Sequence, residues 1–69
     1  MKISARNVLK GKVKSVKPGS VNDEITMLLS GGDEMVAIIT KASSKRMRLA
    51  KNKKVYAIIK ASSVMIGVD

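Results

Sequence analysis

The 69-residue chain carries 14 basic and 5 acidic residues, a formal charge of +9, and has neither cysteine nor histidine. This length allows one domain, residues 1–69, whose core is so small that we expect subunit association to stabilise it. Without cysteine or histidine, the chain has no disulfide, no thiolate or imidazole metal site and no histidine base. The positive charge predicts an anionic partner, which could be nucleic acid, a membrane surface or a small oxyanion. Solubility is the alternative role for the surface lysines.

The sequence also indicates where the protein is found. Residues 1–7 have no apolar run behind their positive charge, so they do not form a signal peptide. No segment approaches the roughly 20 apolar residues that cross a membrane. We therefore expect a cytoplasmic protein, and the absence of cysteine fits a reducing compartment. Because the chain begins at Met1 and holds one domain, we expect it to be free-standing; the alternative is a regulatory module beside a transporter or transcription factor.

The first part of the chain has the two-residue period of strands. Lys10, Lys12 and Lys14 alternate with smaller residues, which predicts a strand with one solvated face. Proline and glycine in the segment Lys17–Ser20 predict a turn after it. Alternation resumes over Val21–Leu29, which predicts a second strand.

The middle of the chain predicts a hairpin and then a helix. Ser30–Asp33 contains two glycines and is typical of a hairpin turn. The continuous apolar run Met35–Ile39 predicts a third strand that is buried on both faces. Alternation then stops at Thr40, a residue able to cap a helix, and a short helix is expected over roughly residues 41–49.

The last part of the chain predicts two more strands. After the charged turn Lys51–Lys54, residues 55–60 alternate again, Ala61–Ser63 interrupts the pattern, and residues 64–68 predict a short fifth strand. The fold class is therefore all-β, with one short helix between strands three and four. This order favours a five-stranded OB-fold-like barrel, with a plain meander capped by a helix as the alternative. Leu28 and Ile58 fall on otherwise polar faces, where they could contact a partner subunit.

The residues present do not favour catalysis. The carboxylates form two adjacent pairs and a terminus, and neighbours on a strand point to opposite faces, so neither pair makes an acid–base dyad. The serines have no histidine to activate them. Gly31 and Gly32 lack the following lysine of a phosphate-binding loop. We therefore expect a binding protein with no cofactor and no bound metal cation.

Three short segments combine the groups that bind an anion. A deprotonated tetrahedral dianion only accepts hydrogen bonds, so its site needs amides, hydroxyls and cations. The segment Ser4–Asn7 offers a hydroxyl and a guanidinium, Thr40–Ser44 offers hydroxyls at a predicted helix start, and Lys60–Ser63 offers an ammonium and hydroxyls. Each segment taken alone is also an ordinary terminus, cap or loop. The spacing does not show that the three segments converge.

Two motifs at opposite ends of the chain resemble those of a known family. The opening motif is Ser4-Ala5-Arg6-Asn7, and the closing motif is Lys60-Ala61-Ser62-Ser63-Val64-Met65. Gly11-Lys12-Val13, Gly19–Glu24 and Ala37–Thr40 extend the match. The sequence resembles the molbindins, the free-standing members of the Mop (TOBE) family of molybdate-binding domains. One departure is the turn Ala50–Lys53, where relatives often have a glycine; Asn52 tolerates the left-handed backbone that a turn requires.

The resemblance implies an OB-like barrel in a hexamer, a trimer of dimers, with molybdate or tungstate bound between subunits for storage, buffering or homeostasis of molybdenum. It implies that one subunit contributes the opening motif and another contributes donors from the middle and end of the chain. The resemblance also implies a second oxyanion site near a threefold axis. The implied oxyanion ligands are Ser4, Ala5, Arg6, Thr40, Ser43, Lys60, Ala61 and Ser62, and those of the second site are Ser20 and Val21.

The composition of the three segments agrees with this ligand. None contains a carboxylate, so protonated phosphate would leave its hydrogen unpaired, at about 1 to 3 kcal/mol. Sulfate must be excluded by size. The alternative function is a basic OB-fold nucleic-acid-binding domain. Its binding face, residues 21–39, has no aromatic residue and carries four of the five acidic residues, which disfavours base stacking and phosphate contact.

Overall fold

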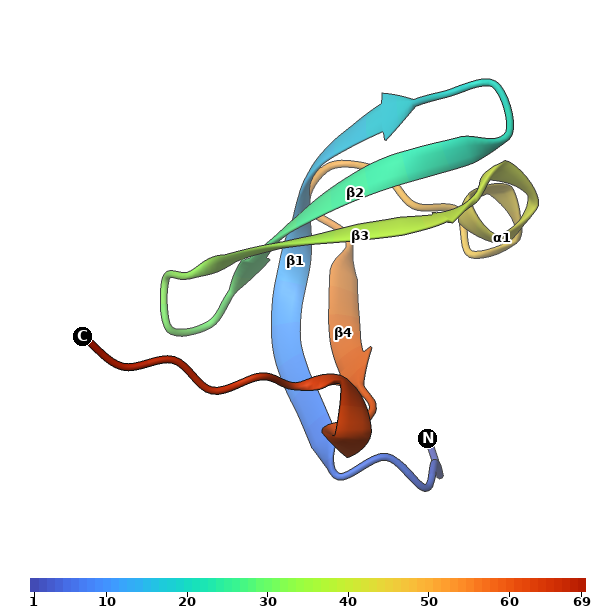
Figure 1. The fold of residues 1–69 in the computed structure, drawn as a ribbon. Coiled ribbons are helices and arrows are strands. Elements are labelled where there is room, and N and C mark those ends of the chain that lie inside the picture. The colour runs from blue at the N-terminus through green and yellow to red at the C-terminus, as the bar shows by residue number, and fades with distance from the viewer.

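The computed structural model describes all residues, 1–69, as one curled antiparallel sheet with a short helix at one end (Figure 1). The strands lie in the order β3-β2-β1-β4. None of the helices is long and apolar enough to span a membrane. The bounds are β1 Asn7–Pro18, β2 Asn22–Leu29, β3 Glu34–Thr40, α1 Lys41–Arg46, β4 Lys54–Ile59 and a 3₁₀ helix η1 Ala61–Ser63.

The pairing of β4 distinguishes the two architectures expected from the sequence. β4 pairs with β1, from Asn7 opposite Ile59 to Lys12 opposite Lys54, whereas a plain meander would place it beside β3. The strands curl into an open half-barrel with free edges at β3 and β4 (Figure 1). The OB-like topology is therefore confirmed for four strands.

The expected fifth strand does not form. Residues 64–69 have no regular structure and are exposed, and they run away from the sheet (Figure 1). Met65, Ile66 and Val68 are 92%, 89% and 94% exposed, although they are apolar. The prediction of a fifth strand was wrong for this chain by itself, because a strand needs a neighbour with free backbone groups and the tail lies against none.

β1 curls because of an irregularity in its pairing with β2. Val13 lies opposite Met27 and Ser15 lies opposite Thr26, so Lys14 is an extra residue in the ladder. Such a bulge bends a strand and reverses its alternation. Consequently Val13 is fully buried, Ser15 is exposed, and Val16 again packs on the core.

Gly11 allows β1 to approach β2 closely at this bend. A Cβ atom at Gly11 would lie 2.6 Å from the backbone oxygen of Leu28, too close for any side chain without a backbone shift.

The turn after β2 is the expected hairpin: the Leu29 amide donates to the Asp33 oxygen at 2.8 Å, and Gly32 has a φ of 99°. Both glycines are thus required by geometry.

The core is small and lies on the concave face of the sheet. Its buried apolar residues are Val13, Ile25, Met27 and Ala57, of which Val13 alone is fully buried. β3 is an edge strand whose alternate residues Val36 and Ile38 are exposed. The expectation that Met35–Ile39 is buried on both faces was therefore wrong: a strand at the edge of a single sheet has nothing to cover its outer face.

The helix is shorter than expected and ends at Arg46 rather than near residue 49. Arg48 adopts a φ of 53°, a left-handed conformation that cannot continue a helix. The Lys53 ammonium donates to the Met47 backbone oxygen beyond the last turn. Asn52 adopts a φ of 74°, so the turn Ala50–Lys53 takes the left-handed backbone that the sequence analysis expects Asn52 to tolerate.

Candidate oxyanion-binding site

The opening and closing motifs lie at the same end of the β1–β4 ladder. Asn7 opens β1 opposite Ile59, the last residue of β4, so Ser4–Arg6 and Lys60–Ser62 extend from adjacent strand ends (Figure 1). The backbone oxygen of Lys60 accepts from the Ser63 amide at 2.9 Å, which closes η1. We call this group of residues, 4–6 and 60–62, the terminal cluster.

The terminal cluster carries two cations that make no contact with an acid. The ion pairs of the chain are Lys14 with Glu34 and Lys41 with Asp23. Arg6 and Lys60 take part in neither, their side chains make no hydrogen bond, and both residues are exposed. Because nothing inside the chain neutralises them, both charges can act on a bound anion.

The remaining candidate ligands form a second group beside α1. Thr40 ends β3 opposite Asn22, and the Lys41 amide donates to the Val21 oxygen at 2.9 Å. This contact places the turn that contains Ser20 against the first residue of the helix. We call residues 20–21 and 40–43 the helix cluster.

The hydroxyls of the helix cluster are ordered by the helix cap. The Ser43 amide donates to Thr40 Oγ1 at 3.1 Å, and Thr40 Oγ1 in turn donates to Ser43 Oγ at 2.9 Å. The Ser43 hydroxyl hydrogen has no acceptor within the chain. One hydroxyl proton therefore remains for a ligand.

The structure does not bring the two clusters together. The terminal cluster lies at the start of β1 and the helix cluster lies near its end, and the strand between them has 12 residues, a contour of roughly 40 Å (Figure 1). Thr40 and Ser43 therefore do not share a site with Lys60 of the same chain. One oxyanion can contact both clusters only where two copies of the chain meet.

A buried carboxylate lies beside the helix cluster, and the sequence reasoning did not single it out. Asp23 Oδ1 accepts from Lys41 Nζ at 2.8 Å and from the Gly19 amide at 3.4 Å. The hydrogen bond from Lys41 lowers the pKa of Asp23 despite its desolvation, and buried Ser44 adds to the effect. The available signal was its position: Asp23 falls on the same side of β2 as core residues Ile25 and Met27. An acidic side chain therefore lies beside the helix cluster, whereas no carboxylate makes an ion pair with the terminal cluster.

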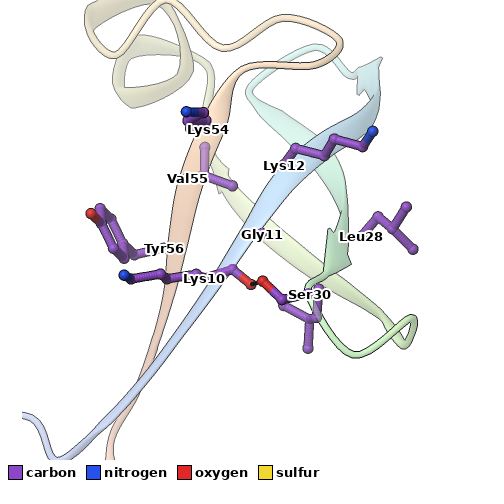
Figure 2. A pocket seen from close by; sticks show the side chains of 9 residues that line it. Lys10, Gly11, Lys12, Leu28, Ser30, Lys54, Val55 and Tyr56 are labelled. Carbon is purple, nitrogen blue, oxygen red and sulfur yellow. Dashed lines mark hydrogen bonds between the residues drawn. The ribbon is translucent and has the colours of Figure 1, made fainter.

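A third basic region lies on the outer face of the sheet. Lys12 pairs directly with Lys54 and Lys10 with Tyr56, around an open groove of about 610 Å³. Figure 2 shows Lys10 extending toward Tyr56 while Lys12 extends to the other side of β1. The ammonium groups diverge, so this groove attracts anions without enclosing one.

Comparison with known proteins places the chain in a family. Residues 3–66 match the TOBE domain model. The chain belongs to the TOBE domain family. It is 49% identical over 69 residues to the "probable molybdenum-pterin-binding protein" of Haemophilus influenzae, with all of both chains aligned. The resemblance based on the opening and closing motifs is confirmed.

Two solved structures of molybdate-binding proteins share this fold. A molybdate-binding protein from Sporomusa ovata is 38% identical with a TM-score of 0.92, over 99% of this chain and 100% of that one. ModG, described as a cytoplasmic molybdate-binding protein and solved with molybdate bound, is 51% identical with a TM-score of 0.85. That match covers 88% of this chain but only 43% of ModG. These relatives are named for binding rather than for a reaction.

Proposed function

We propose that this single-domain chain binds molybdate or tungstate at subunit interfaces of a cytoplasmic homo-oligomer, as a store or buffer of the oxyanion and without catalytic activity. The observation that carries the proposal is the terminal cluster, where Arg6 and Lys60 lie unpaired beside hydroxyls at adjacent strand ends. The relatives named for molybdenum or molybdate support the identity of the ligand.

The roles of the ligands follow from their chemistry. Arg6 and Lys60 supply positive charge, and the hydroxyls of Ser4 and Ser62 and the amides near Ala5 and Ala61 supply hydrogen bonds to the oxygens. No carboxylate of the chain makes an ion pair with this cluster. A fully deprotonated dianion therefore satisfies the donors, whereas protonated phosphate leaves one hydrogen without an acceptor.

An interface is the natural place to complete this site. Most residues of each cluster are exposed, and the two clusters lie at opposite ends of β1 in one chain. When the terminal cluster of one copy meets the helix cluster of another, Thr40 and Ser43 join the donors and the ligand is enclosed. We also infer that Ser20 and Val21 contribute to a second oxyanion site at another contact between subunits.

The concave face of the sheet supports assembly. An apolar cavity of about 660 Å³ opens between the free edges of β3 and β4, and its lining includes Met35, Ile39 and Ile59. This is where a fifth strand would close the barrel. The apolar tail, residues 64–68, is exposed and unpaired in its own chain. We infer that the tail of one copy covers the face of another, in a hexamer built as a trimer of dimers.

Calorimetry tests the ligand and its residues together. The intact oligomer is titrated with molybdate, tungstate, sulfate and phosphate at neutral pH, and we expect tight binding of the first two and weak binding of phosphate. Arg6→Ala and Lys60→Ala should each weaken molybdate binding roughly 10- to 100-fold, since a hydrogen bond to a charged group contributes about 1.5 to 3 kcal/mol.

The matched controls remove the same charges elsewhere. Arg46→Ala and Lys51→Ala alter exposed cations outside both clusters, so each should change the affinity less than about threefold through long-range charge alone. If the controls weaken binding as much as the site variants, binding depends on net charge and the proposed site is wrong. If neither molybdate nor tungstate binds at micromolar concentration, the proposed function is wrong.

A further inference from the structure

Asp23 joins three segments at the helix end of the sheet. The residue lies at the start of β2 and is 5% exposed. Its carboxylate accepts from the Lys41 ammonium of α1 and from the Gly19 amide of the turn between β1 and β2. A buried carboxylate with these partners fixes their relative positions, because moving any of them leaves a buried polar group unpaired.

The same segments carry the helix cluster. Lys41 directly follows Thr40, and its amide bonds to Val21 in the turn while its ammonium bonds to Asp23. Lys41 is thus held at both its backbone and its side chain. The Thr40 hydroxyl, whose direction is set by the first turn of α1, is held with it.

We propose that Asp23 is a positioning residue for oxyanion binding, which holds the first turn of α1 so that the Thr40 and Ser43 hydroxyls face the ligand. This inference rests on the proposed function. Asp23 also engages the charge of Lys41 inside the chain, so that Lys41 is not a ligand although it lies in the helix cluster.

The proposal predicts an effect opposite in sign to simple electrostatics. A carboxylate near an anion site repels the anion, so removing its charge should strengthen binding if charge alone matters. Removing a positioning group should weaken binding, although the net charge becomes more positive. The sign of the change therefore separates the two explanations.

The experiment compares Asp23→Asn with Glu34→Gln by calorimetry with molybdate on the intact oligomer. Both variants remove one negative charge that is paired with a lysine, but Glu34 pairs with Lys14 in an exposed contact on β1 and β3, outside both clusters. We expect Asp23→Asn to weaken binding about tenfold, the effect of roughly one misplaced hydrogen bond. We expect Glu34→Gln to leave it within about twofold. Equal or tighter binding by Asp23→Asn overturns the inference.

A second variant makes the test independent of folding defects in Asp23→Asn. Lys41→Met removes the ammonium that pairs with Asp23 and keeps an unbranched apolar side chain, and it is measured alone and together with Asp23→Asn. If Asp23 acts through Lys41, the double variant should bind molybdate as tightly as the single variant with the larger loss of affinity. If the losses of binding free energy in the two single variants add up fully in the double variant, the proposal is contradicted.

Amide spectra of the unliganded protein give a readout that does not depend on binding. The Thr40 and Ser43 amide resonances should move in Asp23→Asn and stay in place in Glu34→Gln; unchanged resonances in both overturn the inference. The two proposals fail separately. Wild-type protein that binds neither molybdate nor tungstate contradicts the proposed function, whereas wild-type binding matched by Asp23→Asn contradicts only the role of Asp23.

Discussion

Removing the apolar tail should dissociate the oligomer. The perturbation is deletion of residues 64–69, which leaves the terminal cluster intact. Met65, Ile66 and Val68 are each about nine-tenths exposed in the isolated chain. Burying a side chain of this size contributes about 1.5 to 3 kcal/mol, so the three together contribute roughly 4 to 9 kcal/mol per chain if a partner covers them. Because about 1.4 kcal/mol is a tenfold change, subunit dissociation should rise by at least about three orders of magnitude.

The assay is light scattering after size-exclusion chromatography over a dilution series. Full-length protein should remain oligomeric at concentrations where the deletion variant runs as a monomer. Deletion of Asp69 alone is the matched control, because it shortens the same tail without removing an apolar side chain. If the deletion variant keeps the full-length oligomeric state at every dilution, the tail does not cover a partner and the inferred assembly is wrong.

Three further predictions concern stability. Thr40→Val removes the acceptor of the Ser43 amide, and it should lower the free energy of unfolding by about 1 kcal/mol in urea titrations; no change would mean that the cap does not form. Gly11→Ala places a Cβ atom 2.6 Å from a backbone oxygen, and it should destabilise by about 1 to 3 kcal/mol, whereas Gly31→Ala, with nothing within 4 Å, should stay within about 0.5 kcal/mol. Equal effects would contradict the close approach of β1 and β2. The folded-state pKa of Asp23 lies below its ordinary value of 3.8, so its stabilisation is present above about pH 4 and is lost as pH falls through the lowered pKa. Asp23→Asn should therefore flatten the pH dependence of stability in that acid range, and an unchanged acid-unfolding curve would contradict this.

The local elements could be predicted because their signals are contained in the sequence. Alternation over residues 21–29 and the two glycines of the hairpin determine β2 and its turn. The bulge at Lys14 could not be predicted, since the lysines alternate through it without any change in the type of residue. The left-handed Arg48 likewise gave no residue-type signal, and the helix was therefore expected to be too long.

The errors in burial have one physical cause. From their apolar sequences, residues 35–39 are expected to form a strand buried on both faces, and residues 64–68 a short fifth strand. In the single chain, Ile38 is 67% exposed and the tail lies against nothing. The pattern of apolar residues indicates which surfaces need to be buried. It does not indicate whether the residues that bury them belong to the same chain or to another subunit.

The composition of the candidate site could be proposed from the sequence, but its geometry could not. Residue types indicated which groups can donate to an anion, and the resemblance implied that the first and last segments share a site. That these two segments extend from adjacent strand ends, while Thr40 and Ser43 lie at the far end of β1, follows only from the pairing of the strands. The role of Asp23 could not be predicted, because the sequence analysis considers Asp23 and Glu24 only as a candidate acid–base pair. The sequence does not show that the Asp23 carboxylate is buried against Lys41.

Native mass spectrometry with and without molybdate tests the central claim most directly, because it reports subunit number and bound oxyanion in one spectrum. We expect a homo-oligomer that carries a defined number of molybdate ions, with any monomer peak free of ligand. The deletion variant that lacks residues 64–69 should show monomers without molybdate. Monomers that retain molybdate, or an oligomer that takes up none, would contradict a binding site formed between subunits.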